Sequence, residues 1–342
     1  METLFWNERE HRLRAFWRLL MYAELYIILT LIFGLGLAFL WVVVSVVASG
    51  GYDAARINAG ITDSPFFLLA SSVGSLLATL FCTAVAGRFL DRRPLDDFGF
   101  RFRRGWWLDF GAGLALGALL MSGIFAMEWA LGWVSVTGFF QTTQNWPFPI
   151  MVLVYGILFL CVGIYEELLF RGYFLRNLAE GLNLARLGPV VALLLAWIGS
   201  SLVFGAAHLS NPGATFFSTA NIALAGIFLG MGYMLTGELA FPIGLHIAWN
   251  FFQGNVFGFP VSGTTSTTSL IAIEQGGPEI WTGGVFGPEA GILGIIAMVM
   301  GSLLTWLWVR YRTGQAHLQT RLAVYGLADE SPALAAEPAA VE

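Results

Sequence analysis

The stretch that decides the fold is FPIMVLVYGILFLCVGIYEELL, residues 148–169, where a long run without charge ends in Glu166 and Glu167. A spanning helix needs about 20 mostly apolar residues, so this run is long enough to cross a bilayer. Adjacent glutamates at its end have no lipid-facing explanation, because ionisable groups inside membranes are costly and usually functional. The stretch therefore predicts both a spanning helix and a candidate site.

The whole chain shares this apolar character. Of its 342 residues, 57% are hydrophobic and 11% are charged, whereas soluble domains carry about 25% charged residues. Lipid can solvate so much apolar surface, and helices satisfy their own backbone groups within it. The composition predicts an all-α fold, a polytopic membrane helix bundle, with the lipid bilayer as a partner and no nucleic-acid partner.

About eight apolar runs are candidates for transmembrane helices. Their ranges are 20–48, 66–87, 107–133, 148–169, 189–209, 217–236, 239–258 and 289–309. The sixth and seventh runs are separated only by Thr236, Gly237 and Glu238. The first run is too long for the core of a signal peptide and is interpreted as a signal anchor.

The basic residues orient the bundle. All 17 are Arg, and all except Arg56 fall in the N-terminal segment, the connections after spans two and four, and the C-terminal tail. By the positive-inside rule, these parts are predicted to be cytosolic, giving an N-in/C-in topology that agrees with an even number of spans. The absence of Lys indicates a GC-rich genome, and the expected location is a bacterial inner membrane.

The predicted organisation has three parts. Residues 1–18 mix charges with aromatic side chains, which predicts an amphipathic interfacial helix on the cytosolic side. Residues 19–310 are the bundle, and residues 311–342 are a cytosolic tail, disordered after about 328 because it is rich in Ala, Pro and Glu. The Gly/Ser/Thr-rich connection 259–288 is predicted to lie on the outer face, with no assigned role.

Few ionisable side chains remain inside the spans. Glu24, Glu128 and Glu238 fall near span ends, where they are expected to reach the interface. Cys82 and Cys161 lie in separate apolar runs and predict neither a disulfide framework nor a cysteine-based zinc site. The polar residues left in the later spans are Glu166, Glu167, His208, His246 and Asn250.

The spacing of these residues indicates different roles. Glu167 and Arg171 are i,i+4 neighbours and can pair on one helical face, which leaves Glu166 free. A nearby like charge and partial burial both favour a protonated Glu166 carboxyl, as acid–base work near neutral pH requires. His246 and Asn250 also share a face; Asn can hold an oxyanion, and imidazole can orient a water, take a proton or bind a metal.

Each of these motifs alone also fits a structural role. A buried Glu–Arg pair often only stabilises a bundle, and a lone histidine often bonds a neighbouring helix. Their conjunction, with almost no other polar residue in the spans, favours a site. The GxxxG patterns at Gly113/Gly117 and Gly226/Gly230 instead predict close helix packing.

Three motifs follow one another on successive segments: Glu166-Glu167-x-x-x-Arg171, Phe204-x-x-x-His208 and His246-x-x-x-Asn250. In this order they resemble the CPBP family. These are the CAAX-protease and bacteriocin-processing proteins, also called the ABI family, which includes the type II CAAX prenyl endopeptidase. The resemblance covers about residues 148–258, which is the expected catalytic core.

The resemblance implies an intramembrane endopeptidase. Glu166 and His208 would activate the attacking water, His246 and Asn250 would stabilise the oxyanion, and Glu167 and Arg171 would support the site. It allows either a metalloprotease, with Zn²⁺ held by Glu166, His208 and His246, or a metal-independent glutamate protease. The expected partner is a membrane-associated peptide or protein substrate, of which a prenylated CAAX-type protein is one candidate.

Two other functions remain open, a non-catalytic immunity or scaffold protein and a transporter with Glu166 and Glu167 as an ion site. The depth of the site is open as well. Straight helices would place Glu166 and His208 roughly 25 Å apart, at opposite ends of spans four and five. A helical hairpin that turns near Leu187, Gly188 and Pro189 would instead bring them level, in a cavity walled by spans four to seven.

Overall fold

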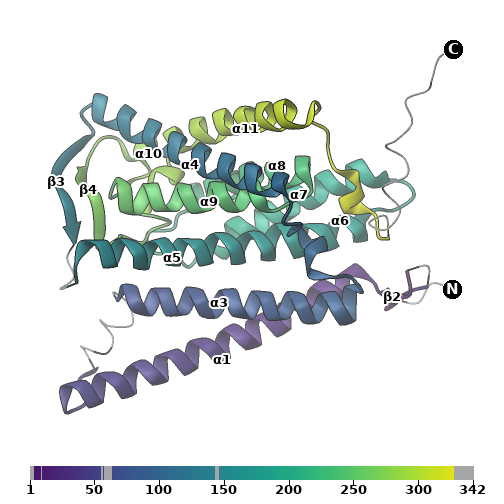
Figure 1. Cartoon of the computed structure of the whole chain (residues 1–342), viewed down its shortest axis with the longest axis horizontal. Coiled ribbons are helices and arrows are strands. Elements are labelled where there is room, and N and C mark those ends of the chain that lie inside the picture. Colours follow the sequence, from purple (N-terminus) through teal and green to yellow (C-terminus); the bar gives the residue numbers. More distant parts are fainter. Residues whose placement is uncertain (1–3, 9, 55–56, 58–63, 143–145, 327–342) are drawn as a thin grey trace.

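The computed structural model describes residues 4–8, 10–54, 57, 64–142 and 146–326. This part of the chain forms a bundle of long helices with two small antiparallel sheets (Figure 1). The helices are α1 Ala15–Ser49, α3 Pro65–Ala86, α4 Arg104–Ala130, α5 Phe148–Glu167, α6 Arg176–Leu182, α7 Gly188–Ala207, α8 Phe216–Thr236, α9 Ala240–Phe251, α10 Glu279–Thr282 and α11 Ile292–Thr313. The strands are β1 Trp6–Asn7, β2 Arg12–Leu13, β3 Val134–Thr142 and β4 Thr268–Gln275.

Short π- and 3-10-helical segments extend or join these elements. The π-helical segments are η1 Gly87–Asp91, η3 Leu168–Leu175 and η4 Phe252–Val256. The 3-10 segments are η2 Leu95–Phe98, η5 Gly284–Phe286, η6 Pro288–Ala290 and η7 Thr320–Ala323. Through η3, helix α5 continues directly into α6.

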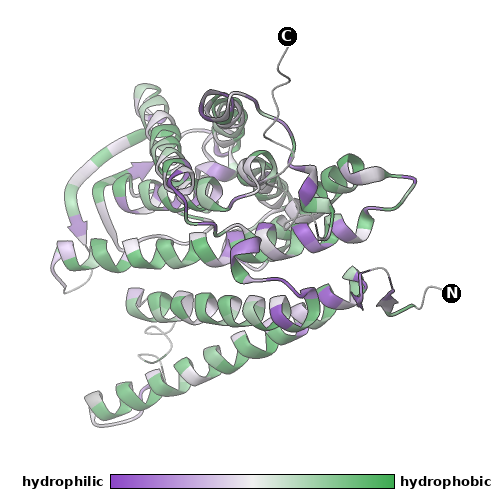
Figure 2. Ribbon diagram, turned by 45° about the vertical axis from the view of Figure 1, so that its right-hand side comes forward, coloured by the Kyte–Doolittle hydropathy of each residue, from purple (hydrophilic) through white to green (hydrophobic). Residues whose placement is uncertain are grey.

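Seven helical stretches of the described chain are long and apolar enough to cross a membrane. Figure 2 shows the long helices as mainly hydrophobic, with hydrophilic residues gathered toward the end where β2 and α6 lie. The chain is therefore a polytopic helical membrane protein, as its composition predicts. The remaining predicted span, 239–258, corresponds to α9 and η4, and α9 itself is only 12 residues long.

The two described ends of the chain meet at one end of the bundle. The Arg12 guanidinium lies over the Tyr325 ring, 3.5 Å from its centroid. The number of passes and the cytosolic assignment of that end stay predictions. Arg56 and the tail after 328 lie outside the described residues.

The predicted N-terminal amphipathic helix is wrong for the described residues before Ala15. Strands β1 and β2 pair there as a short antiparallel ladder, and α1 begins only at Ala15. Arg12 and Arg18 are buried and form ion pairs with Glu180 and Asp91. These buried pairs fix the segment against the bundle, whereas an interfacial helix would keep its charges in water.

The fourth span also runs further than its predicted end at 169. Glu180 on α6 is surrounded by guanidinium groups, with Arg93 at 2.5 Å and Arg12 at 2.7 Å. We call this set the arginine cluster; its members are Arg12, Arg18, Arg93, Arg176, Asp91, Asp97 and Glu180. Because mutual ion pairs satisfy these charges, a polar stretch can continue the apolar helix.

The outer connection contains a strand that the sequence did not predict. Strand β4, from the 259–288 segment, pairs with β3 between α4 and α5. Glu128 at the end of α4 is fully buried and accepts a hydrogen bond from the Gln275 side chain at 2.7 Å. The expectation that Glu128 reaches the interface is therefore wrong, because the β3–β4 sheet covers it.

Close backbone packing joins α9 to α4 and α8 to α7. A Cβ at Gly117 of α4 would lie 2.6 Å from the Leu245 carbonyl oxygen, and a Cβ at Gly226 of α8 would lie 2.9 Å from Ser201 of α7. Both predicted GxxxG surfaces are thus packing surfaces, which only small residues permit. At the other end of α8, Gly237 has a φ of +72°, which glycine adopts without strain, and reverses the chain into α9.

Candidate active site

A chain of buried polar contacts joins two of the predicted motifs. Glu167 Oε1 accepts a hydrogen bond from Arg171 at 2.8 Å, as the i,i+4 spacing predicts, and lies 2.8 Å from His246 Nδ1 on α9. Since a carboxylate only accepts, His246 Nδ1 carries the proton. Its Nε2 is then directed to Glu166, whose Oε2 is 3.8 Å away.

Arg171 is held from three directions. Besides Glu167, its guanidinium donates to the Gly226 carbonyl oxygen at 3.0 Å and lies over the Phe204 ring, 4.5 Å from the centroid. The side chain is 1% exposed. Arg171 therefore fixes Glu167 and joins η3 to α7 and α8, but does not itself face open space.

Glu166 has different contacts from those of Glu167. Its Oε1 accepts a hydrogen bond from the Tyr165 hydroxyl at 3.2 Å, and 14% of its side chain is exposed, whereas Glu167 is fully buried. The neighbouring glutamates thus have different surroundings, as their angular separation on a helix predicts. Glu166 retains the capacity to bind a further hydrogen-bond donor.

His208 follows the last residue of α7. Its Nδ1 lies 2.8 Å from the Phe204 carbonyl oxygen. Because a carbonyl oxygen only accepts, Nδ1 carries the proton and Nε2 has the lone pair. The ring packs against Phe204 with centroids 4.9 Å apart, so Phe204 of the second motif lies between His208 and Arg171.

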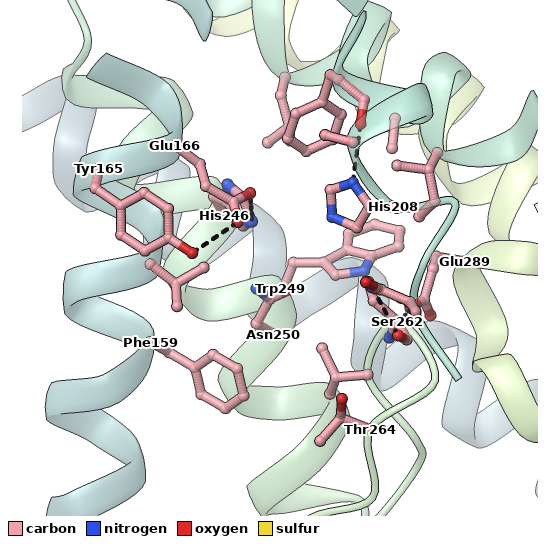
Figure 3. Close-up of a pocket in the computed structure, with 18 of the residues that line it drawn as sticks. Phe159, Tyr165, Glu166, His208, His246, Trp249, Asn250, Ser262, Thr264 and Glu289 are labelled. Atoms are coloured by element: carbon pink, nitrogen blue, oxygen red, sulfur yellow. Dashed lines mark hydrogen bonds and ion pairs between the residues drawn. The ribbon is translucent and has the colours of Figure 1, made fainter. Parts of the chain in front are cut away.

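One cavity of about 520 Å³ joins these groups. It is lined by Glu166, His208, His246 and Asn250, as Figure 3 shows. The helical hairpin accounts for their common depth: α5, η3 and α6 continue to Leu182, and α7 returns from Gly188. The structure thus brings together four of the six predicted site residues in the cavity and places Glu167 and Arg171 behind His246.

The cavity has more walls than the predicted spans four to seven. Tyr26 of α1, Leu68 of α3 and the polar segment around Ser262 also line it. Glu289 of η6 lines the same space and bonds Ser262. Local sequence pattern indicated neither residue, because Glu289 falls at the start of the predicted span 289–309 and its bond to Ser262 depends on tertiary packing.

The three predicted metal ligands do not lie in a metal-binding arrangement. Although Glu166, His208 and His246 share the cavity, the described residues contain no group of three or more His, Cys, Asp or Glu side chains placed to hold an ion. His246 Nδ1 is already bonded to Glu167, and His208 Nδ1 to a carbonyl oxygen. The side chains as they lie do not form a zinc site, and Zn²⁺ stays a prediction.

One segment of the chain is similar to a known protein family. Residues 145–252 match the family described as type II CAAX prenyl endopeptidase Rce1-like. No curated protein and no solved structure gave a match to the chain. The resemblance predicted from the three motifs is confirmed for this segment, which nearly coincides with the expected core 148–258.

Proposed function

We propose that the protein is an intramembrane endopeptidase that hydrolyses a peptide bond with a water activated by Glu166. The observation that carries the proposal is the convergence of Glu166, His208, His246 and Asn250 on one cavity within the bundle. The family match over residues 145–252 supports a CAAX-protease type of enzyme. The proposed substrate is a peptide segment held at or within the bilayer.

Activation of the water rests on two acceptors. Glu166 lines the cavity with a carboxylate that takes the water proton. The His208 Nε2 lone pair accepts a hydrogen bond from the same water, because Nδ1 is engaged by the Phe204 carbonyl oxygen. The water oxygen then attacks the carbonyl carbon of the peptide bond.

The negative charge that develops on the carbonyl oxygen is stabilised by hydrogen-bond donors. The Asn250 amide supplies one N–H, and His246 supplies a second from Nε2 when its ring is protonated. The contact between His246 Nδ1 and Glu167 orients the ring, so that its Nε2 faces Glu166. As the intermediate collapses, the proton held by Glu166 passes to the leaving amine, and the C–N bond breaks.

A cleavage assay tests the proposal. Purified protein in lipid vesicles is incubated with a prenylated CAAX-type peptide, and the wild type is compared with Glu166→Gln and with Glu274→Gln, an exposed glutamate of β4. We expect cleavage by the wild type and by Glu274→Gln only. Cleavage that survives in Glu166→Gln would refute the role of this carboxylate.

A chelator arm of the same assay addresses the metal. A water activated by Glu166 and His208 alone predicts activity that a chelator does not change. Loss of activity that is restored by added Zn²⁺ would instead favour the metalloprotease alternative, in which Glu166, His208 and His246 would hold the ion. A bacterial inner membrane remains the expected location.

A further inference from the structure

The outer connection, residues 259–288, reaches the cavity in a tight turn. Val261 and Thr264 exchange two backbone hydrogen bonds, of 2.8 and 2.9 Å. The two residues between them, Ser262 and Gly263, have φ angles of +48° and +83°, which is the pattern of a type I′ turn. Val261, Ser262 and Thr264 line the cavity, so this turn forms part of its wall.

Ser262 is held through its backbone from two sides. Its N–H donates to the Glu289 carboxylate at 2.6 Å, and its carbonyl oxygen accepts a hydrogen bond from the Asn211 side-chain amide at 3.0 Å. The next N–H, that of Gly263, donates to the Phe286 carbonyl oxygen at 2.7 Å. A left-handed backbone at a residue other than glycine persists only where the surrounding contacts impose it. These three bonds supply that constraint.

Asn211 connects the turn to the second motif. Its backbone N–H donates to the His208 carbonyl oxygen at 3.1 Å, in the loop that follows α7. The two segments pack closely, since a Cβ at Gly263 would collide with the Pro212 carbonyl oxygen. The backbone that carries His208 is therefore attached to the outer connection.

Glu289 connects the same turn to the third motif. Its carboxylate also contacts the side-chain amide of Gln253, which donates to the Pro260 carbonyl oxygen at 2.5 Å. Gln253 is fully buried in η4, three residues after Asn250 on the segment that continues α9. Figure 3 shows Glu289 beside Ser262, on the side of the cavity opposite Glu166. We call the hydrogen bonds that join Asn211, Ser262, Glu289 and Gln253 the outer clamp.

We propose that Asn211 and Glu289 are positioning residues of the active site. Through the 261–264 turn, they fix His208 relative to Asn250. The inference rests on the proposed function, because the geometry that the outer clamp maintains is that of the water-activating and oxyanion-binding groups. It assigns a role to the outer connection.

Small displacements matter at such a site. A misplacement of about 1 Å can lower a rate about 100-fold. Asn250 belongs to α9, which packs closely on α4 at Gly117. His208 instead lies just after the last residue of α7, so its position depends on what the following loop contacts. Loss of the outer clamp should therefore displace His208 more than Asn250.

Two variants test the inference in the cleavage assay. Asn211→Ala removes the donor to the Ser262 carbonyl oxygen, and Glu289→Leu removes the acceptor of the Ser262 N–H. We expect kcat to fall about 10- to 100-fold in each, with KM near that of the wild type. A rise in KM with unchanged kcat would make Asn211 a substrate-binding residue and overturn the inference.

A matched control separates positioning from stability. The Asn183 side-chain amide donates to the Ala323 carbonyl oxygen at 2.9 Å, away from the cavity. Asn183→Ala thus removes the same kind of bond as Asn211→Ala, and the two should lower the unfolding midpoint by similar amounts. Only Asn211→Ala should lower kcat. Asn211 is partly exposed, so its variant should fold even if Glu289→Leu does not.

Hydrogen exchange tests the outer clamp without reference to cleavage. We expect amides of the 205–212 segment to exchange about fivefold faster in Asn211→Ala than in the wild type or Asn183→Ala, as the loss of one hydrogen bond predicts. Unchanged exchange in Asn211→Ala would refute the inference even if the wild type cleaves the peptide. Faster exchange without cleavage by the wild type would support the outer clamp and contradict only the proposed function. Faster exchange with unchanged kcat would refute the positioning role.

Discussion

The continuous helix from α5 to α6 passes through two buried charged regions, and they differ in what surrounds them. Around Glu180, the arginine cluster closes on itself: Arg12 and Arg93 lie within 2.7 Å of the carboxylate. Glu166, in contrast, accepts a hydrogen bond from Tyr165, lies 3.8 Å from His246 and borders an open cavity. Both regions are buried and ionic, but only the second leaves room for a substrate.

Burial and charge are common to both regions, so neither property separates a structural cluster from a site. A buried ion pair is weak evidence of function, because mutual pairing alone can account for it. Glu167 and Arg171 form such a pair, yet Glu167 also contacts His246 and thereby orients a ring toward open space. A site is indicated where a fully hydrogen-bonded ion pair positions a neighbouring side chain that still has hydrogen-bonding capacity beside a cavity.

The largest expected effect comes from Glu166→Gln. Gln keeps the size of the side chain but cannot take a proton, so cleavage should fall by about 100- to 10,000-fold. The thermal unfolding midpoint should change little, because Glu166 lies at a cavity. If Glu166→Gln lowered the unfolding midpoint as well as the activity, Glu166 would have a structural role like that of Glu180.

Glu180→Gln should behave in the opposite way. Removing one charge from the arginine cluster leaves several guanidinium groups without their shared partner, at a cost of about 3–5 kcal/mol in the free energy of unfolding. Unfolding in detergent, compared with Glu274→Gln, measures this loss. The cleavage rate per folded molecule should stay near that of the wild type, and a selective loss of activity would contradict the distinction.

A third buried carboxylate, Glu289, should make the stability of the protein depend on pH. Burial raises the pKa of Glu289 from 4.5 to about 7 in the folded state. The folded state therefore binds the proton more tightly, so this contribution is full below about pH 4.5 and is lost as the pH rises through about 7. The loss is on the order of 3 kcal/mol. Unfolding midpoints at pH 5 and 8 should differ less in Glu289→Gln than in the wild type.

The smallest expected effect concerns packing behind the site. Gly117→Val forces a side chain against the backbone of α9 near Trp249 and should cost about 1–3 kcal/mol in the free energy of unfolding. Because α9 carries His246 and Asn250, activity should fall as well. Gly123→Val, on the same helix with open space around its Cβ position, is the matched control. Equal effects of the two changes would remove the assigned role of the α4–α9 contact.

Local pattern and composition were enough to predict the membrane class of this protein, most of its spans and one of its ion pairs. Apolar run lengths fixed the membrane class and most spans, and i,i+4 spacing predicted the Glu167–Arg171 pair, since both depend only on neighbours along one helix. The order of three motifs was sufficient to indicate the family that residues 145–252 match. The N-terminal segment was assigned wrongly, because its arginines find partners on α6 and η1 that local pattern does not reveal.

Contacts between distant segments were decided by the tertiary structure alone. The bond between His246 and Glu167 joins residues 79 positions apart, and Glu289 bonds Ser262 from 27 positions away. The length of α6 likewise depended on Arg12 and Arg93, which lie far from Glu180 in the chain. Such pairings follow from how whole helices pack, so the sequence determined which groups were available for chemistry, and the fold decided which of them share one cavity.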